Sequence, residues 1–169
     1  SPAHGARTLV VNPADPAASP YGWLQTVQQV AAGHTYARGN LVRAYDDSAD
    51  DNTPAIDESA DGGPTLTFDF PFDPNAEPDV NRAAAITNLF YMNNMIHDIT
   101  YRFGFNEAVG NFQTNNYGKG GQGNDAVLAQ ALDGGGTNNA NFATPSDGNP
   151  GRMQMYVCDG SSGAIVKAT

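Results

Sequence analysis

The sequence predicts an α+β chain that combines one long helix with several short strands. Residues 79–103 carry apolar side chains at steps of four and three, which is the spacing of one helical face. Runs on both sides of this segment alternate apolar and polar residues and end at glycine, proline or asparagine, as half-buried strands do. The chain has 169 residues, the size of one domain or of one half of a two-lobed enzyme.

The first part of the chain is predicted to be mostly irregular. Residues 1–22 are rich in proline and are expected to form an extended lead-in. A weak helical or strand pattern follows at residues 23–30, and "HTYARGNLVRAYDD", residues 34–47, indicates a short strand that runs into a loop. Residues 46–64 are acidic and rich in serine, proline and glycine, so we expect an exposed loop there.

The segment "TLTFDFPFD", residues 65–73, predicts a half-buried strand. Its large side chains alternate with polar ones and would share one face: Leu66, Phe68, Phe70 and Phe72. Pro71 cannot donate a hydrogen bond to a neighbouring strand, so the end of this segment is expected at an edge or an exit.

The long helix has predicted ends as well as a predicted apolar face. Asp79 is a plausible N-cap, because its carboxylate can accept from the first unpaired N–H groups. Gly104 stands where a glycine commonly ends a helix. The apolar residues form one stripe: Ala85, Leu89, Met92, Ile96, Ile99 and Phe103.

The chain after Gly104 is predicted to form a loop, a buried strand and a hairpin. Residues 110–125 are rich in glycine and asparagine. The run "AVLAQALD", residues 126–133, could be helical, but its short length and flanking breakers favour a buried strand. The runs "NNANFAT" and "RMQMYVC" flank "PSDGNPG", whose turn residues predict a β-hairpin.

The composition excludes some classes of partner. The formal net charge is −10 and the pI is near 4.3, which argues against nucleic acid and anionic membranes as partners. No apolar run approaches the roughly 20 residues of a membrane span. Cys158 is the single cysteine, so the sequence allows no internal disulfide and leaves the compartment open.

Two patterns suggest ligands, and each has a simpler interpretation that we favour. Glycines at 118, 120 and 123 match G-x-G-x-x-G, but the motif must follow a strand and open a helix to bind a dinucleotide. A tightly turned loop is therefore favoured over a nucleotide-binding domain. The aspartates within residues 46–61 suggest calcium, but they fit no EF-hand spacing, so a solvated loop is favoured and calcium stays unsupported.

The histidines predict no metal site within this chain. His4, His34 and His97 do not share a helical face, and no H-E-x-x-H is present, whereas zinc needs three or four ligands. His97 lies on the predicted helix beside the apolar stripe. We interpret it as a hydrogen-bonded histidine at a helix–sheet seam, in preference to a catalytic group.

The asparagine-rich run that leads into the hairpin has two interpretations, and the pattern alone favours neither. A side-chain amide offers one acceptor and two donors, which match the C=O and N–H of a peptide unit. A strand that carries Asn138, Asn139 and Asn141 could therefore hold an extended peptide at a sheet edge. The other interpretation is a turn that is stabilised by its own side chains.

A long block of the chain resembles a known protein family. This block covers residues 83–156, "AAAITNLFYMNNMIHDITYRFGFNEAVGNFQTNNYGKGGQGNDAVLAQALDGGGTNNANFATPSDGNPGRMQMY", and it resembles the fungalysin family of secreted zinc metalloendopeptidases. The pieces "DPAASPYGWLQT", "ARGNLVRAYDD" and "TFDFPFDPNAEP" look like the start of the mature peptidase in this family. The resemblance covers roughly residues 12–157, and several unusual blocks occur in the right order.

The resemblance implies a thermolysin-like fold of two lobes with the active-site cleft between them. Residues 1–169 would form the β-rich N-terminal lobe with its long helix. One wall of the cleft would be an edge strand with an Asn-Ala motif. Here Asn139 would bind the substrate main chain through its amide, and Ala140 would offer its carbonyl. The substrates would be polypeptides, and the enzyme would be extracellular.

The sequence also departs from the family pattern. In the family, a helix with H-E-x-x-H and a further glutamate follows the "RMQMY" strand, and this chain ends at Thr169 without them. We therefore expect the protein's own C-terminal zinc-binding lobe, which is missing from this chain, to be its partner, and the fragment alone to be inactive. Cys158 stands where the family usually has an aromatic residue. The alternative function is a non-catalytic extracellular peptide-binding module derived from the protease lobe.

Overall fold

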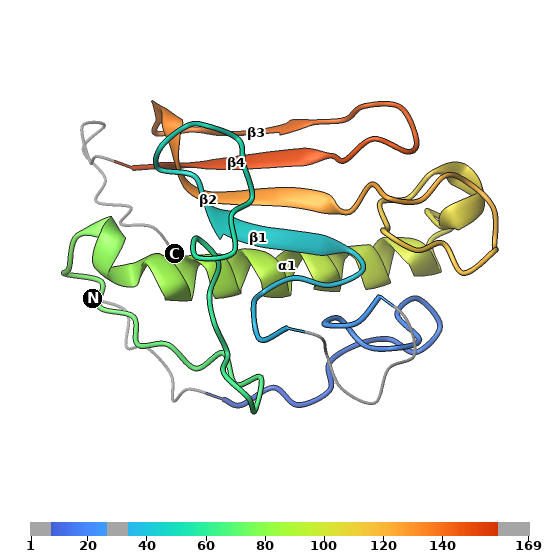
Figure 1. Ribbon diagram of the computed structural model, residues 1–169, viewed down its shortest axis with the longest axis horizontal. Helices are drawn as coiled ribbons and strands as arrows, with labels where there is room; N and C mark the ends of the chain where they lie inside the picture. The colour runs from blue at the N-terminus through green and yellow to red at the C-terminus, as the bar shows by residue number, and fades with distance from the viewer. Residues whose placement is uncertain (1–7, 27–33, 159–169) are drawn as a thin grey trace.

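The computed structural model describes residues 8–26 and 34–158. Within them a mixed sheet packs against one long helix, α1, which runs along one face of the sheet (Figure 1). The predicted α+β class is confirmed. The elements are β1 (Val42–Asp46), η1 (Pro78–Asn81), α1 (Arg82–Arg102), η2 (Glu107–Val109), β2 (Val127–Thr137), β3 (Ala140–Ala143) and β4 (Arg152–Val157).

The strands of the described sheet lie in the order β1-β2-β4-β3. β1 is parallel to β2, and β2 is parallel to β4. β3 pairs only with β4, in the antiparallel hairpin that the sequence predicts, and it forms one edge of this sheet. The long connection between β1 and β2 contains α1, as a parallel crossover requires.

The predicted helix is confirmed, but it begins later than expected. Asp79 is not the N-cap, since it lies inside the short 3₁₀ turn η1, and Asn81 precedes the first residue of α1. The buried Asn81 side chain instead holds the approaching chain, because its amide exchanges hydrogen bonds with the backbone of Asp73. Gly104 follows the helix with φ +97°, a left-handed conformation that suits a stop by glycine.

The apolar stripe predicted for α1 is buried only in its first part. The most deeply buried apolar residues of the helix are Ile86 and Phe90, one position beyond Ala85 and Leu89. Ala85 and Leu89 are partly buried, whereas the exposed residues of the stripe are Met92, Ile96, Ile99 and Phe103. The helix has apolar residues on two faces, and periodicity alone could not show which face the sheet covers.

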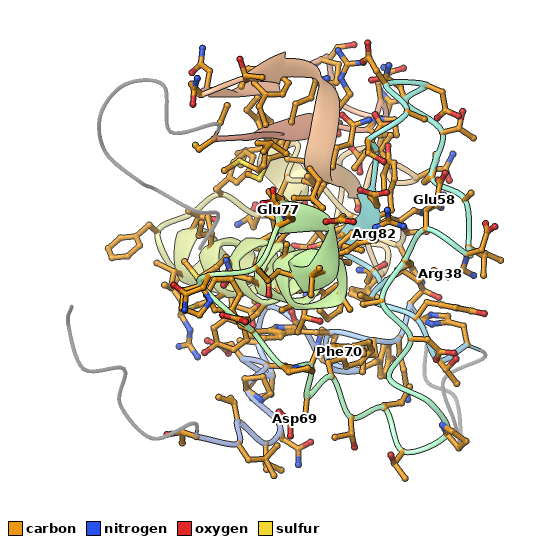
Figure 2. All side chains as sticks on the ribbon, turned by 90° about the vertical axis from the view of Figure 1, so that its left-hand side faces the viewer. Arg38, Glu58, Asp69, Phe70, Glu77 and Arg82 are labelled. Atoms are coloured by element: carbon orange, nitrogen blue, oxygen red, sulfur yellow. The ribbon has the colours of Figure 1, made fainter. Side chains whose placement is uncertain are left out.

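The prediction of a strand at residues 65–73 is wrong. These residues form a turn and an irregular segment, with Leu66 at φ +52°. The alternating pattern still describes burial, because Leu66, Phe68 and Phe70 are half-buried. Phe68 stacks on Phe90 of α1, with 6.1 Å between the ring centroids. Figure 2 shows Phe70 beneath the helix and Asp69 farther from it. The helix thus replaces the sheet as the surface that these rings cover.

The other predicted segments have mixed outcomes. Residues 8–22 contain neither helix nor strand, while part of the 23–30 pattern lies outside the described residues. The 46–64 loop begins inside β1, and its first residues, Asp46 and Asp47, are buried rather than exposed. "AVLAQALD" is a buried strand as predicted, and β2 continues beyond it through three glycines to Thr137.

Candidate functional site

The outer side of β3 offers backbone groups without a neighbouring strand in the described sheet. Across the hairpin, the Tyr156 N–H donates to the Asn139 carbonyl at 3.2 Å. In an antiparallel pair, residues that bond to the partner alternate with residues whose backbone groups point away. The backbone groups of Ala140 and Phe142 therefore point to the open side, and every residue of β3 is exposed. Such an edge can accept an extended peptide as a further strand.

The three asparagines near this edge have different structural roles. Asn138 adopts φ +55° between β2 and β3, which asparagine tolerates better than most residues, and its N–H donates to Val157. The Asn139 Oδ1 atom accepts from the Ala140 N–H at 2.9 Å, so this side chain lies along the open edge. Asn141 is turned toward β4 and bonds Gln154 and Tyr156. Both interpretations of the asparagine run, turn and edge, thus have a residue that supports them.

Aromatic rings border β3 on the side of the sheet that faces α1. Phe142 meets Phe112 edge-on with 5.8 Å between the ring centroids, and Phe112 meets Phe105 at 6.2 Å. Phe142 and Phe105 remain partly accessible, at 41% and 39% of their surface. An extended chain along β3 would therefore find an apolar surface beside polar backbone groups, a combination that suits ligand sites.

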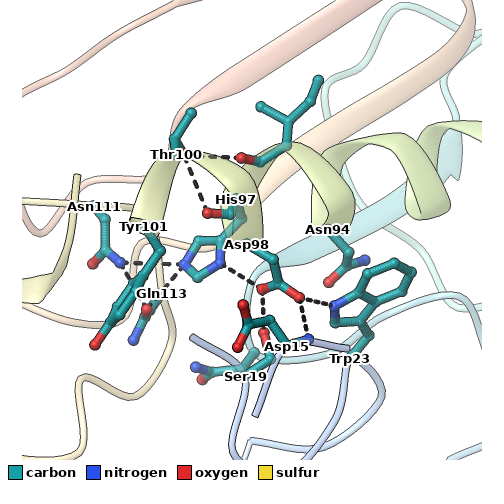
Figure 3. A network of polar contacts seen from close by, with 12 residues as sticks. Asp15, Ser19, Trp23, Asn94, His97, Asp98, Thr100, Tyr101, Asn111 and Gln113 are labelled. Atoms are coloured by element: carbon teal, nitrogen blue, oxygen red, sulfur yellow. Dashed lines mark hydrogen bonds and ion pairs between the residues drawn. The ribbon is translucent and has the colours of Figure 1, made fainter. Parts of the chain in front are cut away.

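His97 is a structural histidine, as the sequence analysis favours. It is buried at the seam between α1 and the loop before β2, with Nε2 3.0 Å from the Gln113 Oε1 and 3.2 Å from the Asn111 Nδ2 (Figure 3). Its Nδ1 lies 3.2 Å from the Asp98 carboxylate. Both ring nitrogens are occupied by neighbours in the fold, which leaves this ring without a position for a substrate.

Asp98 joins the N-terminal lead-in to the helix. Its carboxylate accepts from the Ser19 hydroxyl at 2.6 Å, the Trp23 Nε1 at 2.7 Å and the Asp15 N–H at 2.8 Å (Figure 3). Burial alone would raise the pKa of Asp98. The hydrogen bonds from His97, Ser19 and the others outweigh burial and hold this pKa below its usual range.

The glycine-rich motif does not form a nucleotide site. It lies in the loop between η2 and β2, so it neither follows a strand nor opens a helix. Within this loop, Lys119 pairs with the buried Glu107 at 3.1 Å. The interpretation as a tight turn is supported by left-handed backbone conformations at Gly118, Gly120 and Gly121.

The described residues do not fit a zinc site of the kind that peptidases use. Such a site has three protein ligands, usually including histidine. The one cluster of metal-binding side chains found among the described residues is all-carboxylate and consists of Asp47, Asp50 and Asp133. Protein N–H groups already donate to the oxygens of its two buried members, from Asn52 and Gln130 to Asp47 and from Gly135 and Gln154 to Asp133. The structure therefore gives calcium no support either.

A family model for fungalysin metallopeptidases (M36) matches residues 1–164. The chain belongs to the fungalysin metallopeptidase family. It is 42% identical to extracellular metalloproteinase 5 of Trichophyton tonsurans over 158 residues, which cover 92% of this chain and 25% of the relative. It is 45% identical to extracellular metalloproteinase mep of Aspergillus flavus over 157 residues, 92% of this chain and 24% of the relative. The chain thus spans about a quarter of the length of these relatives.

The long helix and mixed sheet are consistent with the α+β N-terminal lobe predicted for a fungalysin. The family match and the names of the relatives support the description of this chain as part of an extracellular metalloprotease, which is a hydrolase. In the part of the chain that the structure describes, no helix is both long and apolar enough to span a membrane.

The sequence predicts the edge strand but not the hydrogen bonds that connect its side chains to β4 and β2. The pattern groups Asn141 with the peptide-facing asparagines and gives Gln154 no role. The signal that could have found Gln154 is the unusual position of a long amide in the middle of a strand that is apolar on its other face. Asp133, which receives the Gln154 amide, lies in β2 and could not be paired with it before the strand order was known.

Proposed function

We propose that this chain is the substrate-binding wall of a secreted zinc metalloendopeptidase that hydrolyses peptide bonds in polypeptides. The observation that carries this proposal is the open edge of β3, where Ala140 turns its backbone outward and Asn139 lies alongside. An extended substrate would pair with this edge through main-chain hydrogen bonds, which tolerate many side-chain sequences. Asn139 would bind the substrate main chain through its amide, and Ala140 would accept through its carbonyl.

The zinc ion and its ligands would come from residues outside this sequence. In a zinc peptidase the bound metal polarises the scissile carbonyl and activates a water. The described residues offer no ligand set for that role, so we expect the 169-residue chain alone to be inactive. Its contribution would be to hold the substrate in an extended conformation and to exclude water from one side of it.

The exposed stripe of α1 supports a second lobe as the partner of this chain. Ile96 and Ile99 expose 48% and 50% of their surface, and Phe103 exposes 88%. A row of apolar side chains along a helix usually marks an interaction surface when it stays uncovered. We propose that the C-terminal zinc-binding lobe of the same protein covers it.

The test is an Asn139→Ala substitution in the full-length protein, with Asn149→Ala as a matched control. Asn149 is an exposed asparagine of the same hairpin whose amide bonds only within the turn, to Ser146, in the described structure. Losing a hydrogen bond to the substrate should lower kcat/KM for an extended peptide by about tenfold, while the zinc content stays unchanged. Unchanged kcat/KM in Asn139→Ala would remove the proposed role of this residue, and an unsubstituted protein without peptidase activity would favour the non-catalytic peptide-binding module.

A further inference from the structure

A row of polar side chains crosses the described sheet on the face opposite to α1. The row occupies one register position in all four strands: Tyr45 in β1, Gln130 in β2, Gln154 in β4 and Asn141 in β3. The residue before Gln154 in β4, Met153, lies on the other face and is directed at the helix, since its sulfur lies 3.5 Å from the Asn93 amide. Gln130 is fully buried, Tyr45 is 1% exposed and Gln154 is 7% exposed, so these three side chains belong to the interior, whereas Asn141 at the end of the row is exposed.

The loop after β1 covers this polar row. The Asn52 side chain accepts from the Gln130 amide at 3.2 Å and from the Arg152 guanidinium at 2.6 Å. Figure 1 shows this loop crossing in front of β2 and β4, on the side away from α1. The part of the polar row around Gln130 is therefore enclosed between the sheet and residues 47–52.

Asn141 connects the exposed edge strand to this interior. Its Nδ2 donates to the Gln154 Oε1 at 3.1 Å and to the Tyr156 hydroxyl at 2.6 Å, which uses both hydrogens of the amide. The Gln154 Nε2 in turn donates to the buried Asp133 carboxylate at 2.8 Å. Asp133 is fixed on its other oxygen by the Gly135 N–H at 2.8 Å. A continuous chain of hydrogen bonds thus runs from β3 to a buried carboxylate of β2.

The position of Asn141 makes this connection relevant to the open edge. Asn141 lies between Ala140 and Phe142, the two residues whose backbone groups point outward. β3 has only four residues, and in the described sheet one side of its backbone is unpaired. On the helix side the Phe142 ring rests on Phe112. On the face opposite to the helix, β3 is restrained by the hydrogen bonds of the Asn141 amide.

We propose that Asn141 and Gln154 are a positioning pair that fixes the orientation of β3 for substrate. This inference rests on the proposed function. Neither side chain touches the reacting atoms: both act through the strand that carries Asn139 and Ala140. A strand that is rigid before binding does not have to be ordered by the peptide, and this preorganisation improves affinity.

The pair predicts a specific kinetic signature. Without it, β3 keeps its backbone hydrogen bonds to β4 but fluctuates more, and an extended peptide must order the strand when it binds. That cost falls on the bound substrate and the transition state alike, so KM should rise while kcat changes little. The exchange of the β3 amide hydrogens should accelerate even in the absence of substrate, because local opening becomes easier.

The experiment uses the full-length protein with Asn141→Leu and Gln154→Met, two substitutions that keep volume but remove the hydrogen bonds. We expect KM for an extended peptide and the exchange rate of the Asn141 and Ala143 amides, which face β4, each to rise by about five- to tenfold, with kcat within about twofold and zinc content unchanged. The double variant should be no worse than the more severe single one, since both break the same chain of bonds. Tyr156→Phe is a milder variant for the case that Asn141→Leu or Gln154→Met fails to fold. It removes one acceptor of the Asn141 amide, so KM and the exchange rate should rise by less than in the other two variants. Asn149→Ala is the matched control.

Two results would overturn the positioning role. One is an unchanged exchange rate of β3 in the variants, which would show that the pair does not restrain the strand. The other is faster exchange with unchanged KM, which would leave the pair with a structural role only. A failure of the proposed function is recognised separately, in the unsubstituted protein, as an absence of peptidase activity before any variant is compared.

Discussion

Trp23, which directly follows the N-terminal lead-in, donates its indole N–H to the Asp98 carboxylate at 2.7 Å, and this bond ties the start of the chain to its middle. The two residues are 75 positions apart, and both are buried. The lead-in has no helix or strand of its own in the described residues, so its backbone depends on contacts of this kind. Asp98 is thus the polar centre on which residues 15–23 are organised.

The first prediction is that Asp98→Asn destabilises the fold. The carboxylate accepts on both oxygens, from Trp23 and Asp15 on one and from Ser19 and His97 on the other. The substituted amide has a single acceptor oxygen and no charge, so it can satisfy only one of these two sides. We expect a loss of about 3 kcal/mol in the free energy of unfolding, measured by urea denaturation of the full-length protein. Asp79→Asn, a change at an exposed aspartate of η1, is the control and should have little effect. Equal stability of the two variants would contradict this role of Asp98.

The second prediction concerns pH. The pKa of Asp98 is lower in the folded state than in the unfolded chain, so its contribution to stability is complete above the unfolded pKa, about 3.9. That contribution is lost as pH falls through the folded pKa. The difference in unfolding free energy between wild type and Asp98→Asn should therefore shrink steadily below about pH 4. Urea denaturation at a series of pH values measures this, and a constant difference would show that the charge of Asp98 is not responsible.

The third prediction tests the glycine-rich loop as a structural turn. Gly121 has φ +61°, and a Cβ there would meet the Glu107 carbonyl oxygen at 2.0 Å. Gly121→Ala should therefore cost more than about 2 kcal/mol, because the backbone must move. Gly118 has φ +73° with open space around it, so Gly118→Ala should cost only about 1 kcal/mol. Thermal unfolding of both variants gives the comparison, and equal losses would argue against the close packing at Gly121.

Local signals in the sequence identified most elements of the fold. Gly104 marks the end of α1, and the turn residues of "PSDGNPG" mark the hairpin, because both depend on conformations that few residues adopt. The strand order β1-β2-β4-β3 could not be predicted from the sequence, since the alternating runs do not specify which strands become neighbours. Residues 65–72 show the same limit: the alternating rings predict burial on one side, but not whether a sheet or a helix covers them.

One part of the candidate site could be predicted from the sequence, and another part could not. The resemblance to fungalysins places Asn139 and Ala140 at a sheet edge, and the position of β3 at that edge is what this expectation requires. The support of the strand by Asn141 and Gln154 depends on register between β3, β4 and β2. Register arises from packing across the whole sheet, so no spacing within the sequence indicates it.

The fourth prediction is that the uncovered stripe of α1 limits the behaviour of the isolated 169-residue chain. Ile96 and Ile99 are about half exposed and lie one turn apart on the same helix as Met92, and Phe103 directly follows this helix. Isolated chains should associate through this surface, because burying it removes apolar area from water at about 25 cal/mol per Å². Ile96→Lys with Ile99→Lys should reduce association in light scattering, whereas Val80→Lys, at an exposed apolar residue of η1, should not. In the full-length protein the same double substitution should instead destabilise the fold, since the second lobe would have to bury two charges. An isolated chain that stays monomeric at high concentration, or a full-length protein that tolerates both lysines, would contradict the covered-stripe interpretation.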